Sequence, residues 1–491
     1  MRTLYIFLFI LFYPLWLNGQ EKFEEVFTLK EVLEIAKTQS PQAVLATHRF
    51  RNSYWEYRTY QAKYRPSLRL SGNLIDYNKS FQREFVDNEE IFVPKHLNET
   101  QMSLDINQNI GLTGGQLFVN SSLQRLDVFG PDGKTEYVST PTRIGYRQPT
   151  IKYNELRWER RINPLKFEEA KKGYLEDMES VSLRAVQYFF DLILAQINLE
   201  MAEFNYSNAD TLFKIAEGRF EIGTIAENER LQMELSFLNS GLALNEARVN
   251  LEMNKFRLRS FLGYNEDVDI SLIIPTEIPE MEITLEKVMA AALENNPEIL
   301  QMERHLLEAR QNVAQSKAEK GINADIFTSY GLTQSGNDLA AAYTDPLDQQ
   351  GLQVGIELPI LDWGLGRGQH KMALSAMEVI RSNVQQSKID FEQEVFLTTM
   401  QFNLQDDQVA IAAKADTIAG RRYDVTKARF LIGKISVLDL NVSQTEKDQA
   451  KRSYISALRE YWDYYFTIRS LTLFNFEDNQ PITQDYETLM N

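Results

Sequence analysis

Hydrophobic positions along the chain follow two different periods, one helical and one typical of strands. Leu29, Val32 and Ala36 recur at helical spacing and predict a short amphipathic helix. Apolar and polar residues alternate from Met102 to Ile110 and again from Leu352 to Leu358, which predicts strands with one apolar and one polar face. Taken alone, the alternation favours the core of a soluble sandwich. It also fits an outer-membrane barrel, whose apolar face meets lipid while its polar face lines water.

The chain repeats itself at a distance. A segment from Thr28, TLKEVLEIAKTQSP, matches TLEKVMAAALENNP from Thr284 at five of fourteen positions. A second segment from Arg219, RFEIGTIAENE, matches RFLIGKISVLD from Arg429 at five of eleven. The spacings are 284 − 28 = 256 and 429 − 219 = 210, so the first copy carries 256 − 210 = 46 additional residues between the paired segments. This pattern predicts a tandem repeat in which the additional residues form loops or hairpins.

Helix-capping patterns mark the start of each copy. Thr28 and Glu31 have the spacing of a capping box, whereas Lys287 replaces the glutamate in the second copy, so a weaker cap is expected there. Ser40 and Asn296 each precede a proline, which predicts an N-cap followed by proline at the first helical position. A second helix is therefore expected to start at the same place in both copies.

Strand patterns are unequal between the copies. Copy one has four strand-like segments and copy two has only two, so an additional hairpin is the simplest account of the 46 residues. The alternative is that these residues form an extracellular or periplasmic flap. The segments lie near Ser67–Tyr77, Gln101–Ile110, Gln116–Arg125 and Val138–Gln148, and near Ala324–Leu332 and Gly351–Ile360.

Long helices follow the strands in each copy. The first of these holds about 55 to 63 residues, or roughly 80 to 95 Å, and starts near Leu156 or at Pro164 in copy one. Helices of that length bury their apolar stripes along each other, as in a bundle or coiled coil. The expected organisation is a signal peptide at 1–19; repeat one at 20–263, with helices about 28–65, 156–217 and 228–262 and strands about 67–149; repeat two at 264–475, with helices about 284–320, 366–428 and 437–472 and strands about 324–360; and a C-terminal tail at 476–491.

The first residues are typical of a secretory signal. A basic Arg2 precedes an apolar stretch from Leu4 to Leu17, and the small Gly19 is followed by a polar sequence. The stretch is short for the roughly 20 residues that a permanent membrane helix needs. We therefore expect cleavage near Gly19 and Gln20, and an exported protein.

Composition excludes several classes of function. The chain has no cysteine, which excludes disulfides, thiol catalysis, zinc-thiolate sites and a lipid-anchored N-terminal cysteine, so the mature protein is not expected to be a lipoprotein. The net charge of −17 argues against nucleic acid as a partner. Four scattered histidines occur without an HExxH, GxSxG or P-loop motif. We expect neither an enzyme nor a bound cofactor or metal.

The ordered set of motifs resembles the TolC-like outer membrane factor family, also called outer membrane efflux proteins. It comprises the signal peptide, two T-L-x-x-V openings with a proline 13 residues on, and two R-F-x-I-G segments with an acid six residues beyond the glycine. The resemblance covers both halves of the mature chain. It implies an α+β, mostly α fold, in which a long α-helical barrel or coiled-coil tunnel joins a transmembrane β-barrel shared between protomers, each giving four to six strands.

The same resemblance implies a function. The chain would be the outer-membrane channel of a tripartite efflux or type I secretion system, a trimeric passive duct that docks on a periplasmic adaptor protein and an inner-membrane transporter. Independently of the resemblance, four to six strands are too few to enclose a tunnel, so oligomerisation is required. Six strands would give 18 in a trimer instead of the family's usual 12. The alternative function is a soluble periplasmic coiled-coil scaffold without a pore.

Candidate site residues lie at the helix tips and at the strand-to-helix corners. Asp439 and Glu229 are candidates for a pore or gate at the periplasmic tip, since a ring of carboxylates attracts cations. The alternative is that both acids cap helix N-termini. Tyr153 and Trp363, 210 residues apart, are either membrane-interface aromatics or aromatics packed at a corner. The candidates for structure at the tip or contact with the adaptor are Arg219, Phe220, Gly223, Arg429, Phe430 and Gly433.

Overall fold

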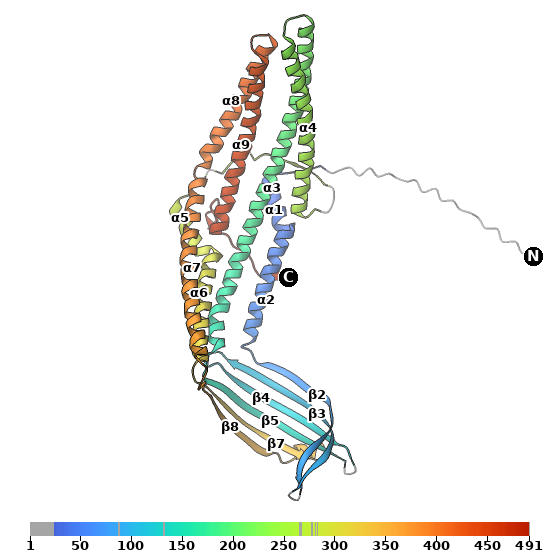
Figure 1. The fold of residues 1–491 in the computed structure, drawn as a ribbon, viewed down its shortest axis with the longest axis vertical. Coiled ribbons are helices and arrows are strands. Elements are labelled where there is room, and N and C mark those ends of the chain that lie inside the picture. Colours follow the sequence, from blue (N-terminus) through green and yellow to red (C-terminus); the bar gives the residue numbers. More distant parts are fainter. Residues whose placement is uncertain are drawn as a thin grey trace, which may run out of the picture.

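The computed structural model describes residues 24–490, except 87–88, 131–132, 265–267, 276–277, 280 and 282. The predicted signal peptide lies outside these described residues. The described chain is a long column of helices that carries an antiparallel sheet at one end (Figure 1). The predicted α+β, mostly α class and the tandem arrangement are confirmed.

Helices of the two repeats follow the same order. Each repeat has a short helix, a medium helix that ends at the sheet, and long helices that run from the sheet to the far end of the column and back. In repeat one these are α1 (Leu29–Gln39), α2 (Pro41–Ala62), α3 (Glu155–Glu221) and α4 (Glu227–Leu262); in repeat two they are α5 (Leu285–Asn295), α6 (Pro297–Glu319), α7 (Leu365–Phe402), α8 (Gln405–Leu431) and α9 (Val437–Thr472).

Caps form as the sequence predicts. The Thr28 N–H donates to Glu31 Oε2 (2.8 Å) and the Glu31 N–H donates to Thr28 Oγ1 (3.4 Å), which completes the capping box of α1. Thr284, which precedes α5, makes no side-chain cap. Ser40 and Asn296 accept hydrogen bonds at the starts of α2 and α6, with proline at the next position. The predicted capping box at Thr28 and the predicted N-caps at Ser40 and Asn296 are therefore confirmed.

The long helices differ between the repeats. α3 begins at Glu155 and continues through Pro164 for 67 residues, about 100 Å. The corresponding helix of repeat two was expected to be continuous over 366–428, but it breaks between α7 and α8. There the Asn403 side chain donates to the Ile283 carbonyl (3.2 Å), and the Leu404 N–H bonds a carbonyl only three residues back. None of the described helices is long and apolar enough to cross a membrane.

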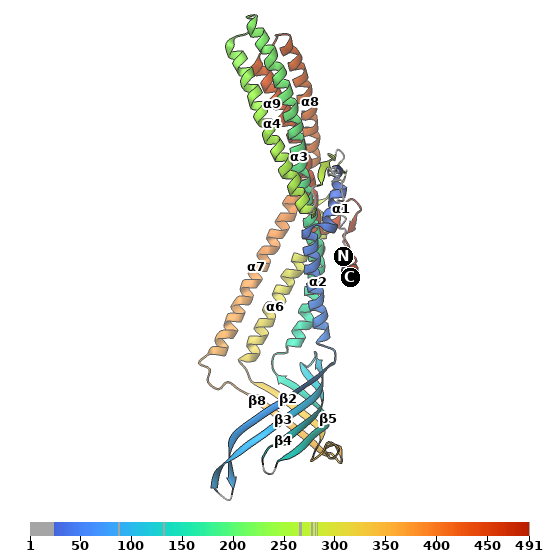
Figure 2. The ribbon, with the colours of Figure 1, turned by 90° about the vertical axis from the view of Figure 1, so that its right-hand side faces the viewer.

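The hydrophobic core lies near the middle of the column. There α1, α3, α5 and α9 meet around buried side chains such as Phe189, Phe190 and Tyr461. A two-stranded parallel sheet of β1 (Glu24–Phe27) and β6 (Asp269–Leu272) joins the starts of the two repeats beside this core. Beyond the core, α9 packs on α8 and α3, and α3 packs on α4, so that α8 and α4 form the outer edges of the far part of the column (Figure 2).

The antiparallel sheet has six strands. Four come from repeat one and two from repeat two, so the 46 additional residues contain an additional hairpin. β5 pairs with β7 and thereby joins the repeats. In order across the sheet the strands are β2 (Ser67–Val86), β3 (Glu89–Ile110), β4 (Gly115–Val128), β5 (Lys134–Ile151), β7 (Asn323–Gly336) and β8 (Leu347–Glu357).

The β2–β3 hairpin is longer than its neighbours. β4 pairs with β3 only from Leu97 to Ile110, so residues 79–86 and 89–96 form a two-stranded ribbon beyond the rest of the sheet. The sequence predicted only the part of this hairpin that lies within the sheet. A short 3-10 helix, η1 (Ala341–Tyr343), lies between β7 and β8; the tail holds β9 (Phe474–Asn475), β10 (Gln480–Pro481) and η2 (Thr488–Met490).

Candidate functional site

One face of the sheet is apolar and open. Leu68, Ile106, Val119, Ile144 and Tyr330 are successive cross-strand neighbours on β2, β3, β4, β5 and β7. Leu68 is 67% exposed and Ile144 is 49% exposed. The apolar face continues to β8, which exposes Leu352, Val354 and Ile356. An apolar surface of this extent marks contact with lipid or another protein.

The opposite face of the sheet is polar. Asp105, Asn120 and Arg143 are cross-strand neighbours on β3, β4 and β5. The Asn120 amide donates to Asp105 Oδ1 (2.7 Å), and Arg143 donates to Asn120 Oδ1 (3.4 Å). The predicted alternation of apolar and polar faces is therefore present across the sheet.

Both outer strands of the sheet lack a second partner in the described chain. β2 pairs only with β3, and β8 pairs only with β7. Each leaves a row of backbone N–H and C=O groups that another strand can pair with. Two open edges on one chain fit head-to-tail association of copies, in which β2 of one copy meets β8 of the next.

At the far end of the column, the two predicted tip segments form the same turn. Gly223 and Gly433 have left-handed backbones (φ +74° and +72°), which a residue with a Cβ adopts at a cost. The residue after each glycine bonds back to the carbonyl of Arg219 (2.9 Å) or Arg429 (3.0 Å). Both glycines therefore end their helices, α3 and α8.

The structure brings some of the predicted tip residues together. Arg219 donates to the Leu431 carbonyl (2.7 Å), and its guanidinium lies 5.6 Å from the centre of the Phe430 ring. Phe430 is buried, and a cavity of ≈ 370 Å³ between the tips is lined by Arg219, Phe430, Gly433 and Glu229. The tips of the two repeats thus contact each other directly.

Two other predicted tip residues do not join this contact. Phe220 is partly exposed and lies beneath the guanidinium of Arg230, 5.6 Å from its ring centre. The Arg429 side chain is exposed. These two residues are therefore available on the outside of the tip.

Both predicted tip acids act as helix caps. The Ser436 N–H and hydroxyl donate to Asp439 Oδ2 (3.3 and 2.7 Å), and the Asp439 N–H donates to Ser436 Oγ (3.2 Å). In repeat one the Ala226 N–H donates to Glu229 Oε2 (3.2 Å), without a side chain to complete the box. Asp439 is nevertheless exposed, so capping leaves its charge accessible to solvent.

The two corner aromatics have different surroundings. Tyr153 is half-buried, and its hydroxyl accepts a hydrogen bond from Gln311 on α6 (2.6 Å). Trp363 is 91% exposed and has a left-handed backbone (φ 52°). Tyr153 therefore packs at the strand-to-helix corner, whereas Trp363 projects from it.

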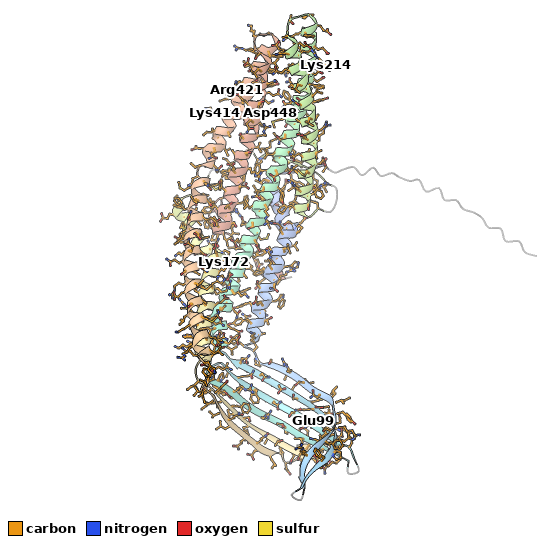
Figure 3. All side chains as sticks on the ribbon, viewed as in Figure 1. Glu99, Lys172, Lys214, Lys414, Arg421 and Asp448 are labelled. Atoms are coloured by element: carbon orange, nitrogen blue, oxygen red, sulfur yellow. The ribbon has the colours of Figure 1, made fainter. Side chains whose placement is uncertain are left out.

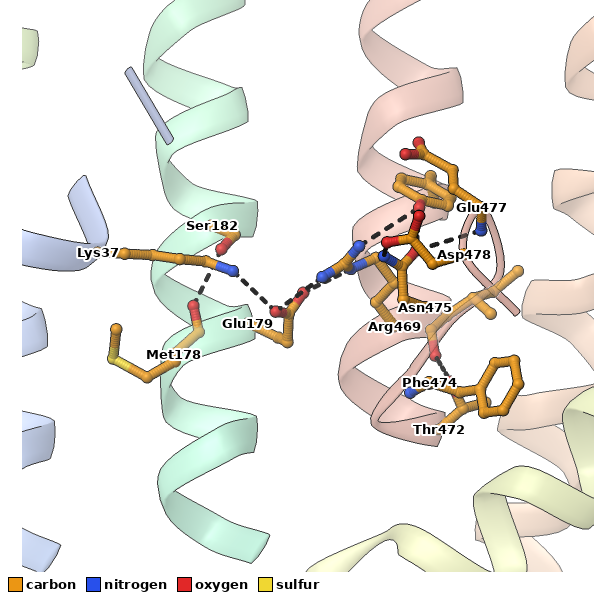
Figure 4. Close-up of polar contacts among 12 residues, drawn as sticks. Lys37, Met178, Glu179, Ser182, Arg469, Thr472, Phe474, Asn475, Glu477 and Asp478 are labelled. Atoms are coloured by element: carbon orange, nitrogen blue, oxygen red, sulfur yellow. Dashed lines mark hydrogen bonds and ion pairs between the residues drawn. The ribbon is translucent and has the colours of Figure 1, made fainter. Parts of the chain in front are cut away.

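A buried ion-pair cluster was not predicted from the sequence. Glu179 of α3 is 1% exposed; it binds Arg469 of α9 through two contacts (2.8 and 3.1 Å) and Lys37 of α1 (2.9 Å), as Figure 4 shows. Burial alone would raise the pKa of the Glu179 carboxyl, but Arg469 and Lys37 outweigh it and hold the pKa below its usual value. The cluster ties repeat one to repeat two. The available signal was Arg469, a lone base in the run Phe466–Leu473, which has no other charged residue.

No group suited to a metal ion is found in the part of the chain that the structure describes: His, Asp and Glu side chains do not gather there in threes as ligands would. The geometry of the described residues is that of a two-faced sheet carried on a helical column (Figure 1).

This fold is that of the outer-membrane channels. It is similar to the CmeC outer membrane channel of Campylobacter jejuni (16% identity, TM-score 0.66, covering 94% of this chain and 88% of that one) and to the outer membrane protein VceC of Vibrio cholerae (12%, 0.62, 93% and 97%). It is also similar to the outer-membrane channel OprN (13%, 0.64, 91% and 90%).

Comparison with family models finds a match in the second repeat. Residues 288–472 match the family model of outer membrane efflux proteins. No curated protein matches the chain. The predicted resemblance to the outer membrane efflux protein family is confirmed by the family model in one repeat and by the fold over nearly the whole chain.

Proposed function

We propose that this protein is the outer-membrane channel of a tripartite efflux or type I secretion system, a passive duct built by three copies of the chain. The observation that carries the proposal is the six-stranded sheet, which is apolar on one face, polar on the other and open at both edges. In a membrane every backbone polar group needs a partner, so such a sheet is stable only when it closes. Three copies would supply 3 × 6 = 18 strands.

The helical column supports the same assembly. Its edge helix α8, with its flanking residues, exposes an apolar residue at every seventh position, and its other edge helix α4 exposes a second apolar stripe. Heptad stripes of this kind are buried against a partner helix. Since the stripes lie on opposite edges of one chain, neighbouring copies would cover them in a ring. The stripes are Leu404, Ile411, Ile418, Val425 and Ile432, and Leu231, Leu235, Leu238, Leu242 and Val249.

The position of the sheet in the membrane would set the orientation of the whole protein. With the sheet in the outer membrane, the column extends into the periplasm and presents the tips, including Phe220 and Arg429, to a periplasmic adaptor and an inner-membrane transporter. The transporter would supply the energy, so the channel needs no catalytic residues. The predicted signal peptide supports export from the cytoplasm. A pore-free periplasmic scaffold would not need the exposed apolar sheet face.

We also propose that Asp439 faces the lumen at the tip, where three copies would form a ring of carboxylates. Asp439→Asn is expected to lower the cation-to-anion permeability ratio of single channels in planar bilayers, because a carboxylate ring in a narrow pore attracts cations.

Ser436→Ala is the matched control for this substitution. It removes the other half of the same cap, at about 1 kcal/mol of helix stability, but leaves the charge in place. An unchanged permeability ratio in Asp439→Asn would restrict Asp439 to capping. A purified wild-type protein that gives no conductance in such bilayers would contradict the channel itself.

A further inference from the structure

Positive charge is concentrated where the helices meet the sheet. We define the collar as residues 58–65, 152–161, 317–320 and 362–371, which cover the four helix–sheet junctions. The collar holds 11 Lys and Arg residues and 4 acids, a net charge of 11 − 4 = +7; since the chain carries −17, the remainder carries −17 − 7 = −24. The collar cations are Arg58, Lys63, Arg65, Lys152, Arg157, Arg160, Arg161, Lys317, Lys320, Arg367 and Lys371.

The helix dipole explains only part of this pattern. α2 and α6 end in the collar, where cations are favoured by the C-terminal end of the dipole. α3 and α7 begin there, and at a helix N-terminus the dipole favours acids instead. Even so, Arg157 and Arg367 lie within the first turn of these two helices. The N-terminal dipoles already have acids beside them, Glu155 in α3 and the Asp362 carboxylate that accepts from the Gly364 and Gly366 N–H groups before α7, so they do not account for these two cations.

Most collar cations have no partner within the described chain. Lys63 pairs with Glu159 (2.7 Å), whereas the other ten have no carboxylate oxygen within 4.0 Å among the described residues. The pKa of His370 is below its usual value, through desolvation first and then through Lys320 and Lys317, as expected in a positive field. The four collar acids offset part of this charge, and the collar keeps a net positive charge of 11 − 4 = +7.

We propose that the collar binds anionic phospholipid head groups of the leaflet that faces the periplasm. This inference rests on the proposed function, which puts the apolar sheet in the membrane. The collar lies at the end of the sheet where the helices join it (Figure 1), and this end of a membrane-embedded sheet would lie where a bilayer changes from acyl chains to head groups. Basic side chains there attract anionic lipids, and the aromatics Trp55, Trp158 and Trp363 are of the type that lies in this zone.

The tryptophans provide a direct probe of this contact. Of the five in the sequence, three lie in the collar or within one turn of it; Trp16 is in the predicted signal peptide and Trp462 is in α9. The full-length trimer is reconstituted into vesicles of phosphatidylethanolamine and phosphatidylglycerol in which one or the other lipid carries brominated acyl chains. We expect brominated phosphatidylglycerol to quench the tryptophan fluorescence more strongly at equal mole fraction, and 1 M salt to remove the difference because the Debye length falls to about 3 Å.

Two double variants that each remove two positive charges distinguish an effect of the collar from an effect of the protein's net charge. Lys152→Gln with Arg157→Gln is expected to lower the preference for phosphatidylglycerol about fivefold or more, since one basic side chain near an anionic surface contributes a factor of about five. The control variant, Lys414→Gln with Arg421→Gln, changes two residues of α8 that lie far from the sheet (Figure 3). It is expected to leave the preference for phosphatidylglycerol unchanged.

Each outcome of this experiment is decisive. Equal quenching by the two brominated lipids would overturn the collar proposal while supporting insertion of the sheet into the membrane. If the collar instead faces the lumen, quenching by the two lipids would be equal and the collar variant would also change the ion selectivity of the channel. No quenching by either lipid would contradict the proposed membrane location itself.

Discussion

Replacing Leu104 with lysine is expected to abolish stable insertion of the protein into outer membranes. Leu104 lies on the apolar face of β3, between Leu70 on β2 and Ser121 on β4. A lysine on the lipid-facing side of a barrel costs about 2–4 kcal/mol near the middle of the bilayer, and three copies in one barrel raise the total to about 6–12 kcal/mol. The measurement is the amount of trimer that remains in membranes after urea extraction.

The neighbouring residue offers a matched control. Ser103 precedes Leu104 on the same strand and faces the polar side, where its hydroxyl lies 3.0 Å from that of Ser71 and 3.2 Å from Asp105 Oδ2. Ser103→Lys is expected to insert normally, because its ammonium would meet water and Asp105. Equal loss of membrane-bound trimer in both variants would show that the apolar face does not contact lipid.

Replacing Glu179 with leucine is expected to destabilise the helical column by about 3–5 kcal/mol, because Arg469 would remain buried without its partner. The double variant Glu179→Leu with Arg469→Met is expected to recover most of that loss, since an apolar pair of similar size is often as stable as a buried ion pair. The measurement is the denaturant midpoint of the helical circular dichroism signal. A double variant no more stable than the single one would contradict this account.

The pH dependence of the same cluster has a definite sign. The pKa of Glu179 is lower in the folded protein than in the unfolded chain, where it is about 4.3. Its contribution to stability is therefore complete above that value and is lost as the pH falls through the folded-state pKa. Wild type is expected to lose more stability on acidification than the double variant.

Repetition and alternation in the sequence predicted the tandem repeat and six strand-like segments, because both are local patterns. They left four to six sheet strands open, and the fold class rested on the family resemblance as well. The capping residues Thr28, Ser40 and Asn296 could be recognised for the same reason, as could the tip glycines. The outer half of the β2–β3 hairpin, residues 79–86 and 89–96, was not predicted. No third strand of the described chain pairs with it, and a ribbon without a core-facing side imposes no alternation of apolar and polar residues.

Features that depend on contacts between distant segments were beyond the sequence. The break before α8 involves a hydrogen bond from Asn403 to Ile283, 120 positions away in the chain. The Glu179 cluster joins residues 142 and 290 positions apart. At the tips, the contact of Arg219 with Phe430 and Leu431 likewise spans the two repeats. Periodicity within one segment carries no information about such pairs.

The central claim is that copies of the chain close one barrel by pairing β2 of one copy with β8 of the next. The protein has no cysteine, so introduced thiols are the only ones present. Ser71 of β2 and Gln353 or Gln349 of β8 all lie on the polar face. Double-cysteine variants of Ser71 with each of these residues, oxidised in native membranes and separated by denaturing electrophoresis, test the claim most directly. We predict that at least one pair gives a covalent trimer while each single-cysteine variant does not; only monomers from every pair would contradict the account.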